Sequence, residues 1–309
     1  MKRQAKGEVH ERITALLNSK YPVYLLQGDK KSLLIDAGVN LLAPSYLASI
    51  KDTFGDAGFI NYLLLTHSHY DHIGSANYMK QHIPDLKVGA HERIVALLRK
   101  PSVLERMNQL SMNHVELEKY NLAGEDPTIH PFDIDIHLKH GDKIDLGGLT
   151  CRVYETPGHT QDSLTFYFPE IKALFPGEAC GVLWGETGGR IQAEFLSSYQ
   201  DYIESLTFLQ SLKPETVCLA HGWVLTSEEV TEFLKDSLSE TFRYRKLIEN
   251  YLDAAHGNIE EATRNMAHVE YDLKGGIFQE RIAYTTNLNA QVKLIANAIS
   301  PRPPGREPA

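Results

Sequence analysis

Cysteine is scarce in this 309-residue chain, and its scarcity narrows the fold class first. The three cysteines, Cys151, Cys180 and Cys218, are odd in number and far apart in the sequence. We therefore expect no disulfide framework, and a reducing cytoplasm is the expected location. No apolar stretch approaches the roughly 18 residues of a membrane span. The opening residues MKRQAKGEVHERITALL show no signal-peptide pattern. These absences predict a soluble cytoplasmic protein.

Basic residues are also in short supply. The chain has 31 Lys and Arg against 40 Asp and Glu, which gives a formal net charge of −9, and the cations form no stripe. This balance argues against nucleic acid and against an anionic membrane as partners. The expected partner is a small-molecule substrate, and the sequence leaves open whether two copies form a homodimer. The length suits one large domain, or one domain with an appendage.

Short apolar runs separated by turn residues dominate the first two thirds of the chain. The runs YPVYLLQG (21–28) and KSLLIDAG (31–38) predict a hairpin, and INYLLLT (60–66) predicts a strand buried on both faces. Helices are predicted over 75–83, 91–99, 102–122 and 198–212, and further strands within 137–160, 164–169, 172–177 and 216–222. From Ser227 to about Ser300 the pattern is wholly helical apart from a Gly-Gly pair. The predicted domains are a core over 1–226, a helical appendage over 227–300 and a disordered Pro-rich tail over 301–309.

The segment LTHSHYDHIG (65–74) is the strongest chemical signal in the sequence. It carries His67, His69, Asp71 and His72 immediately after the uncharged strand INYLLL. A strand end gives the loop a rigid base, and imidazoles with a carboxylate are ligands that suit zinc or iron. The alternative is a polar loop in which histidines happen to cluster. The motif therefore predicts a metal-binding loop.

The same construction recurs downstream. His159 in PGHT, Glu178 in PGEA and His221 in LAHG each follow a short apolar strand and lie beside a glycine. A mixed set of nitrogen and oxygen ligands without Cys favours a catalytic centre, because structural zinc sites are usually closed tetrahedra of Cys and His. Asp36 in LLIDAG has two interpretations: a hydrogen-bond partner of a ligand histidine, or a turn carboxylate. The remaining histidines, His114 among them, are expected at the surface or at caps.

These motifs together resemble those of the metallo-β-lactamase-fold hydrolase superfamily. The resemblance rests on THSHYDHIG, PGHT, a carboxylate after PG, and AHG, and covers roughly residues 20 to 225. It implies an α+β fold, an αββα sandwich of two mixed β-sheets flanked by helices, with the site at one edge. It also implies two metal sites and a bridging Glu178, where most of the family has Asp. The ligands implied are His67, His69 and His159 for one metal and Asp71, His72 and His221 for the other. The implied cofactor is two divalent ions, with zinc the default and iron or manganese suited to the carboxylate content.

Hydrolysis is the chemistry that such a centre supports. Two divalent ions about 3.5–4 Å apart can share a bridging water and lower its pKa towards about 7, which yields a hydroxide that attacks a carbonyl or phosphorus. We expect Asp71 to be catalytic by orienting this hydroxide and passing a proton to the leaving group. One alternative is a regulatory or binding protein that retains the metal site. Another is a flavodiiron-like oxidoreductase, but His69 stands where those enzymes need Glu, and no flavodoxin-like region follows.

The helical appendage resembles that of the PqsE-type subgroup of quinolone-signal proteins, in which such helices cap the metal site. That resemblance implies thioesters similar to 2-aminobenzoylacetyl-CoA as candidate substrates, within a wider class of thioesters, lactones and related esters of small acyl or aromatic groups. The Gly-rich segment GVLWGETGGRIQAEF (181–195) is interpreted as a loop that forms a pocket wall or a surface excursion. The residues expected to line the substrate pocket are Phe195, Trp184, Ile277 and Thr285.

Overall fold

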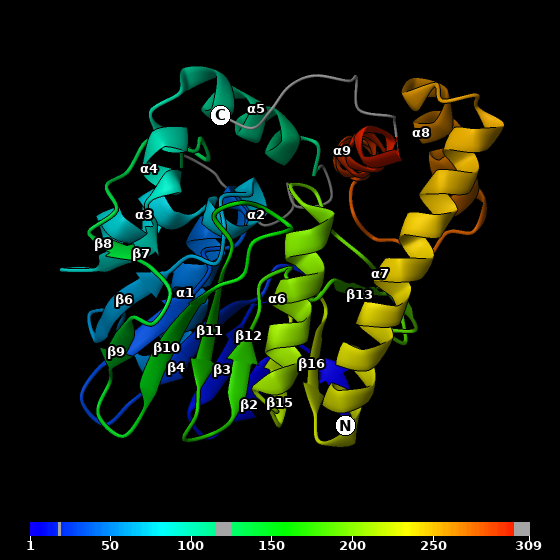
Figure 1. The fold of residues 1–309 in the computed structure, drawn as a ribbon. Coiled ribbons are helices and arrows are strands. Elements are labelled where there is room, and N and C mark those ends of the chain that lie inside the picture. The colour runs from blue at the N-terminus through cyan, green and yellow to red at the C-terminus, as the bar shows by residue number, and fades with distance from the viewer. Residues whose placement is uncertain (18–19, 115–124, 300–309) are drawn as a thin grey trace, which may run out of the picture.

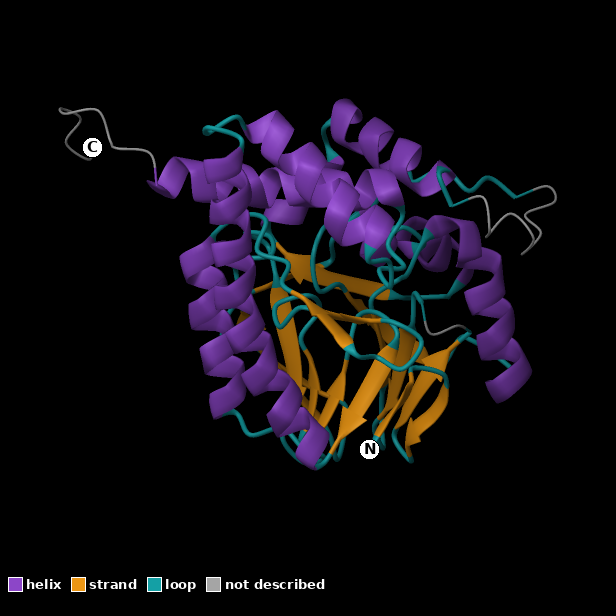
Figure 2. Cartoon of the chain, turned by 90° about the vertical axis from the view of Figure 1, so that its right-hand side faces the viewer, coloured by secondary structure: helices purple, strands orange, loops and turns teal. Residues whose placement is uncertain are grey.

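The computed structural model describes residues 1–17, 20–114 and 125–299. In these residues two seven-stranded sheets stack face to face, with helices outside both of them and across one end of the strands (Figures 1 and 2). Each sheet contains both parallel and antiparallel pairs. The predicted αββα sandwich of two mixed β-sheets is confirmed.

The first sheet comes from the N-terminal half of the chain. Its order is β2 (Gly7–His10), β3 (Ile13–Leu16), β4 (Val23–Gln27), β5 (Ser32–Ile35), β6 (Ile60–Leu64), β7 (Lys87–His91) and β8 (Ile136–Leu138). The predicted hairpin is β4–β5, which pairs Tyr24 with Ile35. Strand β6 has a parallel neighbour on each side, as its uncharged sequence requires for a central strand. Its carboxyl end is therefore held firmly where the His-rich loop begins.

The second sheet supplies the later motifs. Its order is β1 (Lys2–Gln4), β16 (Trp223–Thr226), β15 (Thr216–Cys218), β12 (Ala173–Phe175), β11 (Leu164–Phe168), β10 (Thr150–Glu155) and β9 (Lys143–Asp145). The edge strand β1 pairs antiparallel with β16, so the start of the chain joins the sheet of the second half. Sequence analysis did not predict β1, because three polar residues carry no apolar alternation.

Helices from the first half cover the first sheet, and later helices cover the second. The first set is α1 (Ala43–Phe54), α2 (Tyr70–Ile73), α3 (Ala76–His82), α4 (Arg93–Leu98) and α5 (Pro101–Met112), with a 3₁₀ turn at Asn40–Leu42. The second set is α6 (Tyr199–Ser211), α7 (Glu228–Ala254), α8 (Ile259–Ala267), a π-helix at His268–Leu273, and α9 (Arg281–Ile299). His91 ends β7 rather than starting a helix, since α4 begins at Arg93. The predicted helix over 102–122 ends at Met112, with Asn113 as its C-cap, while residues 115–122 and the tail 301–309 lie outside the described residues.

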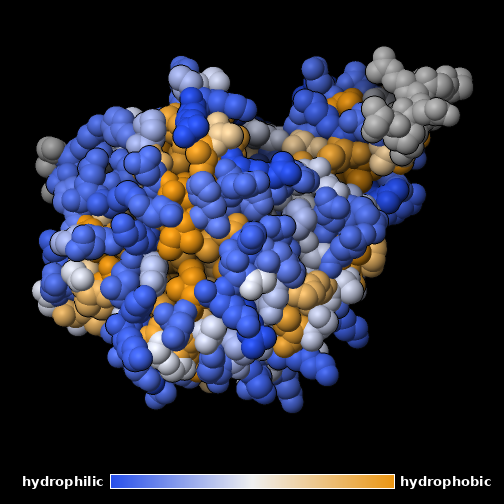
Figure 3. All heavy atoms as spheres, turned by 60° about the vertical axis from the view of Figure 1, so that its left-hand side comes forward, coloured by the Kyte–Doolittle hydropathy of each residue, from blue (hydrophilic) through white to orange (hydrophobic). Residues whose placement is uncertain are grey.

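Three apolar clusters hold these layers together. One lies between the sheets and includes Tyr24, Leu33 and Phe166, and another joins the first sheet to α1 and α3–α5. The third runs without a break from Val217 in the second sheet to Val292 in α9, so the C-terminal helices share a core with that sheet. Among the described residues, no helix combines the length and apolar character that a membrane span needs. Figure 3 shows polar side chains over most of one face, with an apolar band between them.

The segment 181–195 differs from the loop interpreted in the sequence. It forms a hairpin of β13 (Val182–Trp184) and β14 (Arg190–Gln192), in which Leu183 pairs with Ile191. Strands this short fall below the length at which apolar alternation is recognisable. The hairpin nevertheless fixes Trp184 and the residues after Gln192 beside the site described below.

Candidate metal centre

The structure brings the seven predicted site residues together at one edge of the two sheets. They form two groups, and the candidate ligand atoms within each group lie within 4.8 Å of one another. The first group comprises His67, His69, His159 and Glu178, and the second comprises Asp71, His72 and His221. The loop after β6 and helix α2 supply four of these residues, and loops of the second sheet supply His159, Glu178 and His221.

Three imidazole nitrogens converge in the first group. Nδ1 of His69 lies 3.1 Å from Nε2 of His67 and 3.0 Å from Nε2 of His159. Nitrogens bound tetrahedrally to zinc at about 2.0–2.1 Å are separated by roughly 3.3 Å. Oε2 of Glu178 lies 2.9 Å from Nε2 of His159 and adds an oxygen to the same group. The donor set and its spacing fit a divalent metal ion.

Hydrogen bonds on the outer side of the rings assign the protons. Nδ1 of His159 donates to the backbone carbonyl of Glu194 at 2.6 Å, because a carbonyl only accepts. Thr66 donates its hydroxyl proton to Asp36, so its oxygen is free to accept from Nδ1 of His67 at 3.1 Å. Both rings therefore present an Nε2 lone pair towards the centre, which is the state a metal ligand requires.

The second group is held in the same way. Nδ1 of His221 donates to the Lys20 carbonyl at 2.7 Å, and its Nε2 lies 2.8 Å from Oε1 of Glu178 and 3.5 Å from Oδ2 of Asp71. Nδ1 of His72 contacts Oδ2 of Asp36 at 2.9 Å, so Asp36 is a hydrogen-bond partner of a candidate ligand histidine, as its first interpretation expects. Within the described residues, the buried Nε2 of His72 has no hydrogen-bond partner and lies 3.7 Å from Oε1 of Glu178. A buried polar atom without a partner is costly, and a bound cation would satisfy it.

Charge and burial compete strongly at this centre. Burial acts to raise the pKa of Glu178, but His159, His221 and His72 outweigh it and lower that pKa well below 4.5. Burial and the neighbouring histidines lower the pKa of His67 well below 6.5. Burial also disfavours a charged His72, yet Asp36 and Asp71 raise its pKa well above 6.5. An ionised carboxylate among buried imidazoles suits a cation better than it suits a neutral ligand.

Backbone geometry explains the glycine before His159. Gly158 has φ +132°, and a Cβ placed there would lie 2.3 Å from Cα of Tyr202 in α6. Its carbonyl accepts hydrogen bonds from the backbone N–H groups of Leu196, Ser197 and Ser198. Only glycine allows α6 to approach this closely, so the Pro-Gly-His sequence fixes where the His159 ring begins.

A small cavity of about 160 Å³ opens directly onto the centre. His69, Asp71 and Glu178 form its floor, while α5 and α9 form its sides. Nη2 of Arg106 on α5 donates to Oγ1 of Thr286 on α9 at 3.2 Å across the mouth. The other lining residues are Tyr70, Leu110, Gln279, Ala283 and Asn287.

A larger cavity of about 610 Å³ lies beside His221 and contains two of the predicted pocket residues, Trp184 and Ile277. The Trp184 ring stacks on the His221 ring, with centroids 5.7 Å apart. Trp223, Tyr271 and Phe278 add further aromatic surface, and the two cavities share Gln279. This cavity is therefore rich in aromatic side chains, with Gln4, Lys20 and Glu186 as polar lining residues, and it is adjacent to the second group of ligands.

The structure places the other two predicted pocket residues elsewhere. Phe195 is 0% exposed and packs edge-on against Tyr199 in the core, so it lines neither cavity. The hydroxyl of Thr285 donates a hydrogen bond to the Arg281 carbonyl, one turn earlier on α9. The next residues on that helix, Thr286 and Asn287, reach the small cavity instead, because successive positions on a helix point about 100° apart.

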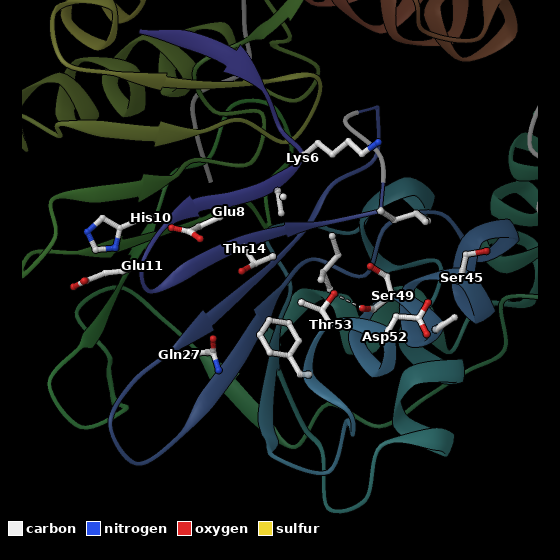
Figure 4. A pocket seen from close by; sticks show the side chains of 16 residues that line it. Lys6, Glu8, His10, Glu11, Thr14, Gln27, Ser45, Ser49, Asp52 and Thr53 are labelled. Carbon is white, nitrogen blue, oxygen red and sulfur yellow. Dashed lines mark hydrogen bonds between the residues drawn. The ribbon is translucent and has the colours of Figure 1, made fainter.

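Another cavity, of about 710 Å³, lies between β2, β3 and α1 (Figure 4). Glu8, Thr14 and Asp52 line it, and it shares no lining residue with either cavity beside the centre. The figure shows polar side chains pointing into it from the strands and from the helix. Ligand chemistry rather than cavity size therefore identifies the functional site.

Sequence analysis missed a buried group behind the metal loop. His114 was expected at the surface or at a cap, but it is 1% exposed and its Nε2 lies 2.7 Å from the hydroxyl of Tyr70. Tyr21 contacts the same histidine and packs edge-on against His221. Tyr70 lies within the THSHYDHIG motif, but spacing gives no indication that it would meet residues 21 and 114. Tertiary packing alone reveals this group.

Two relatives with similar sequences are named as a metallo-beta-lactamase fold-containing protein and as a hydroxyacylglutathione hydrolase. The metallo-beta-lactamase fold-containing protein ST1585 from Sulfurisphaera tokodaii is 29% identical over 218 residues, or 71% of this chain and 78% of that protein. A hydroxyacylglutathione hydrolase from a Bradyrhizobium species is 29% identical over 192 residues, and the match spans 59% of each protein. The chain thus aligns with little more than half of that enzyme.

A solved structure shares the fold, and a family model matches the sequence. TTHA1429 from Thermus thermophilus, a metallo-beta-lactamase family protein, has a TM-score of 0.62 at 19% identity, covering 96% of this chain and 94% of that one. The centre fits a pair of divalent metal ions and a metal-dependent hydrolase. The model of the metallo-beta-lactamase superfamily matches residues 21–221. The chain therefore belongs to the metallo-beta-lactamase superfamily.

Proposed function

We propose that the protein is a dinuclear metal hydrolase that cleaves a thioester, lactone or related ester of a small acyl or aromatic group. One observation carries the proposal: two groups of candidate ligands, five of their seven residues buried, share Glu178, whose two carboxylate oxygens contact His159 and His221 respectively. A carboxylate with one oxygen on each group can bridge two ions. The first group would hold one ion and the second the other, with zinc the first choice for so many imidazoles.

The chain's own residues would prepare the reaction. Bound divalent ions supply Lewis acidity, which polarises a carbonyl and lowers the pKa of water. Asp71 lines the small cavity, and its carboxylate would accept a proton from water and return it to the leaving group. Glu194 and Lys20 would keep His159 and His221 in the ligand tautomer through their backbone carbonyls. Helices α5 and α9 would restrict bulk water at the mouth.

The cavities support the substrate class. The site itself is narrow, at about 160 Å³, so only the reacting bond and its nearest atoms fit there. The aromatic cavity of about 610 Å³ has the size of a small-molecule site and would hold the acyl or aromatic group. The name of the Bradyrhizobium relative describes removal of an acyl group from glutathione, which is consistent with acyl transfer to water.

Turnover of chromogenic thioesters and lactones tests the proposal. We expect hydrolysis after reconstitution with zinc, loss of activity with chelator, and recovery on adding metal. Asp71→Asn should lower kcat at least about a hundredfold, since it removes the proton acceptor. Asp236→Asn, at an exposed position on α7, is the matched control. A zinc-loaded protein that cleaves none of the panel, or an Asp71→Asn variant with full activity, would contradict the assignment.

A further inference from the structure

The C-terminal helix α9 contacts the two residues after β14, Ala193 and Glu194, and the second of them orients a candidate metal ligand. Gln291 on α9 is 0% exposed, and its Nε2 donates to the Ala193 carbonyl at 2.8 Å. One turn earlier, Nδ2 of Asn287 donates to Oε2 of Glu194 at 3.4 Å. Both contacts are made with the residues that follow β14. They lie beside the Glu194 carbonyl, which accepts the hydrogen bond from Nδ1 of His159.

Glu194 is held from several directions. Nε2 of Gln192 donates to its Oε1, and its backbone N–H donates to the Tyr202 hydroxyl at 3.4 Å. The residue is 0% exposed, so no water competes for these contacts from bulk solvent. Its carbonyl therefore has a fixed direction, and Nδ1 of His159 follows that direction at 2.6 Å.

We infer that α9 is a positioning element of the metal centre: Gln291 and Asn287 fix Ala193 and Glu194, and the Glu194 carbonyl fixes the ring of His159. The inference rests on the proposed function in one respect, because it takes His159 as a metal ligand. It goes further by giving the C-terminal helices a role in metal affinity in addition to their place at the cavity mouth.

The chemistry of Gln291 distinguishes positioning from mere stability. Its Oε1 is buried and has no hydrogen-bond partner among the described residues. An apolar side chain of the same shape removes the unsatisfied Oε1, which favours folding, but leaves the Ala193 carbonyl without this donor, which opposes it. Gln291→Met removes the donor to Ala193 while keeping the volume, and the main change should therefore appear at the metal centre.

Metal affinity provides the test, with no need for turnover. Zn²⁺ affinity would be measured by chelator competition, and the visible spectrum of the Co²⁺-loaded protein would report the ligand geometry. Loss of a group that orients a ligand typically lowers affinity about 10- to 100-fold. We expect Gln291→Met to weaken one of the two ions about tenfold and to alter the Co²⁺ spectrum. Asn287→Ala should have a smaller effect in the same direction.

Asn289 provides the matched control on the same helix. Its Nδ2 donates to Oγ1 of Thr263 on α8 and not to Ala193 or Glu194, so Asn289→Ala should leave metal affinity and the Co²⁺ spectrum unchanged. A folded Gln291→Met protein with parental affinity and spectrum would overturn the inference, as would a loss confined to kcat. If Gln291→Met does not fold, the partly exposed Asn287 decides by the same criteria. A parent chain that binds fewer than two ions would instead contradict the proposed function itself.

Discussion

Shortening Glu178 by one methylene probes the centre most directly. Its Oε1 lies 2.8 Å from Nε2 of His221, and its Oε2 lies 2.9 Å from Nε2 of His159. Glu178→Asp withdraws the carboxylate by about 1.5 Å, the length of one C–C bond. Metal sites hold ligand distances to within roughly 0.2 Å. The shorter carboxylate should therefore lose contact with at least one of the two groups.

The expected loss of metal affinity can be calculated from the binding free energy that one ligand contributes. Structural zinc sites with four ligands bind with apparent free energies of about 10–16 kcal/mol, or roughly 3 kcal/mol per ligand. Loss of one ligand should then weaken the affected ion by about a hundredfold. Since the reaction needs both ions, kcat should fall with metal occupancy. Glu178→Ala should weaken both ions, because each group then loses the Glu178 oxygen that contacts it.

Metal analysis after gel filtration, chelator competition and turnover would measure these effects together. Glu215→Asp is the control, since the Glu215 carboxylate forms an exposed ion pair with Lys172. The opposite result is informative, because most of the family has Asp at this position. A Glu178→Asp protein that binds both ions as tightly as the parent would show that the backbone accepts the shorter side chain. A Glu178→Ala protein with two tight ions and full activity would falsify the ligand role of Glu178.

Other variants and conditions test separate parts of the site. His69→Ala should lower bound metal below two ions per chain and abolish hydrolysis with an unchanged circular dichroism spectrum; undiminished turnover would contradict the assignment. Gly158→Ala should destabilise the fold by more than the roughly 1–3 kcal/mol of backbone strain alone, since the new Cβ would meet Tyr202, and urea unfolding would show it. Gly257→Ala is the control for backbone strain alone, because Gly257 also has a positive φ but no neighbour within 4 Å. Equal losses of unfolding free energy in the two variants would show that the contact with Tyr202 adds nothing. The pKa of His72 is raised well above 6.5, burial notwithstanding, by Asp36 and Asp71, so its proton must leave before an ion binds. Apparent zinc affinity should therefore increase as the pH rises above 6.5, and affinity that is flat after correction for the chelator would exclude this coupling.

The parts of the fold that sequence predicted are those with strong local patterns. The hairpin 21–38 and the strand 60–66 have continuous apolar runs and turn residues, and the structure contains β4, β5 and β6 there. The seven site residues were recognisable because each follows such a strand, so the strand ends already indicated a common edge. Metal binding by these residues remains a prediction.

The remaining parts depend on contacts between distant segments. Strand β1 is three polar residues long and exists only because β16 pairs with it. Phe195 was expected in the pocket because it is aromatic and follows Glu178, but its phase after β14 turns it into the core. Asn287 and Arg106 meet the small cavity through the packing of α9 and α5, which no motif encodes.

The division of the ligands between the two sheets has a consequence for assembly. The loop after β6 and helix α2 supply His67, His69, Asp71 and His72, while the second sheet supplies the other three. Neither half of the chain alone supplies all the ligands of either group. An ion that binds ligands from both halves would therefore act as a cross-link between distant parts of the chain. Two fragments separated between His72 and His159 would each hold metal poorly, and would bind it tightly only after they associate. Metal retention would then serve as a reporter of whether the two halves have come together.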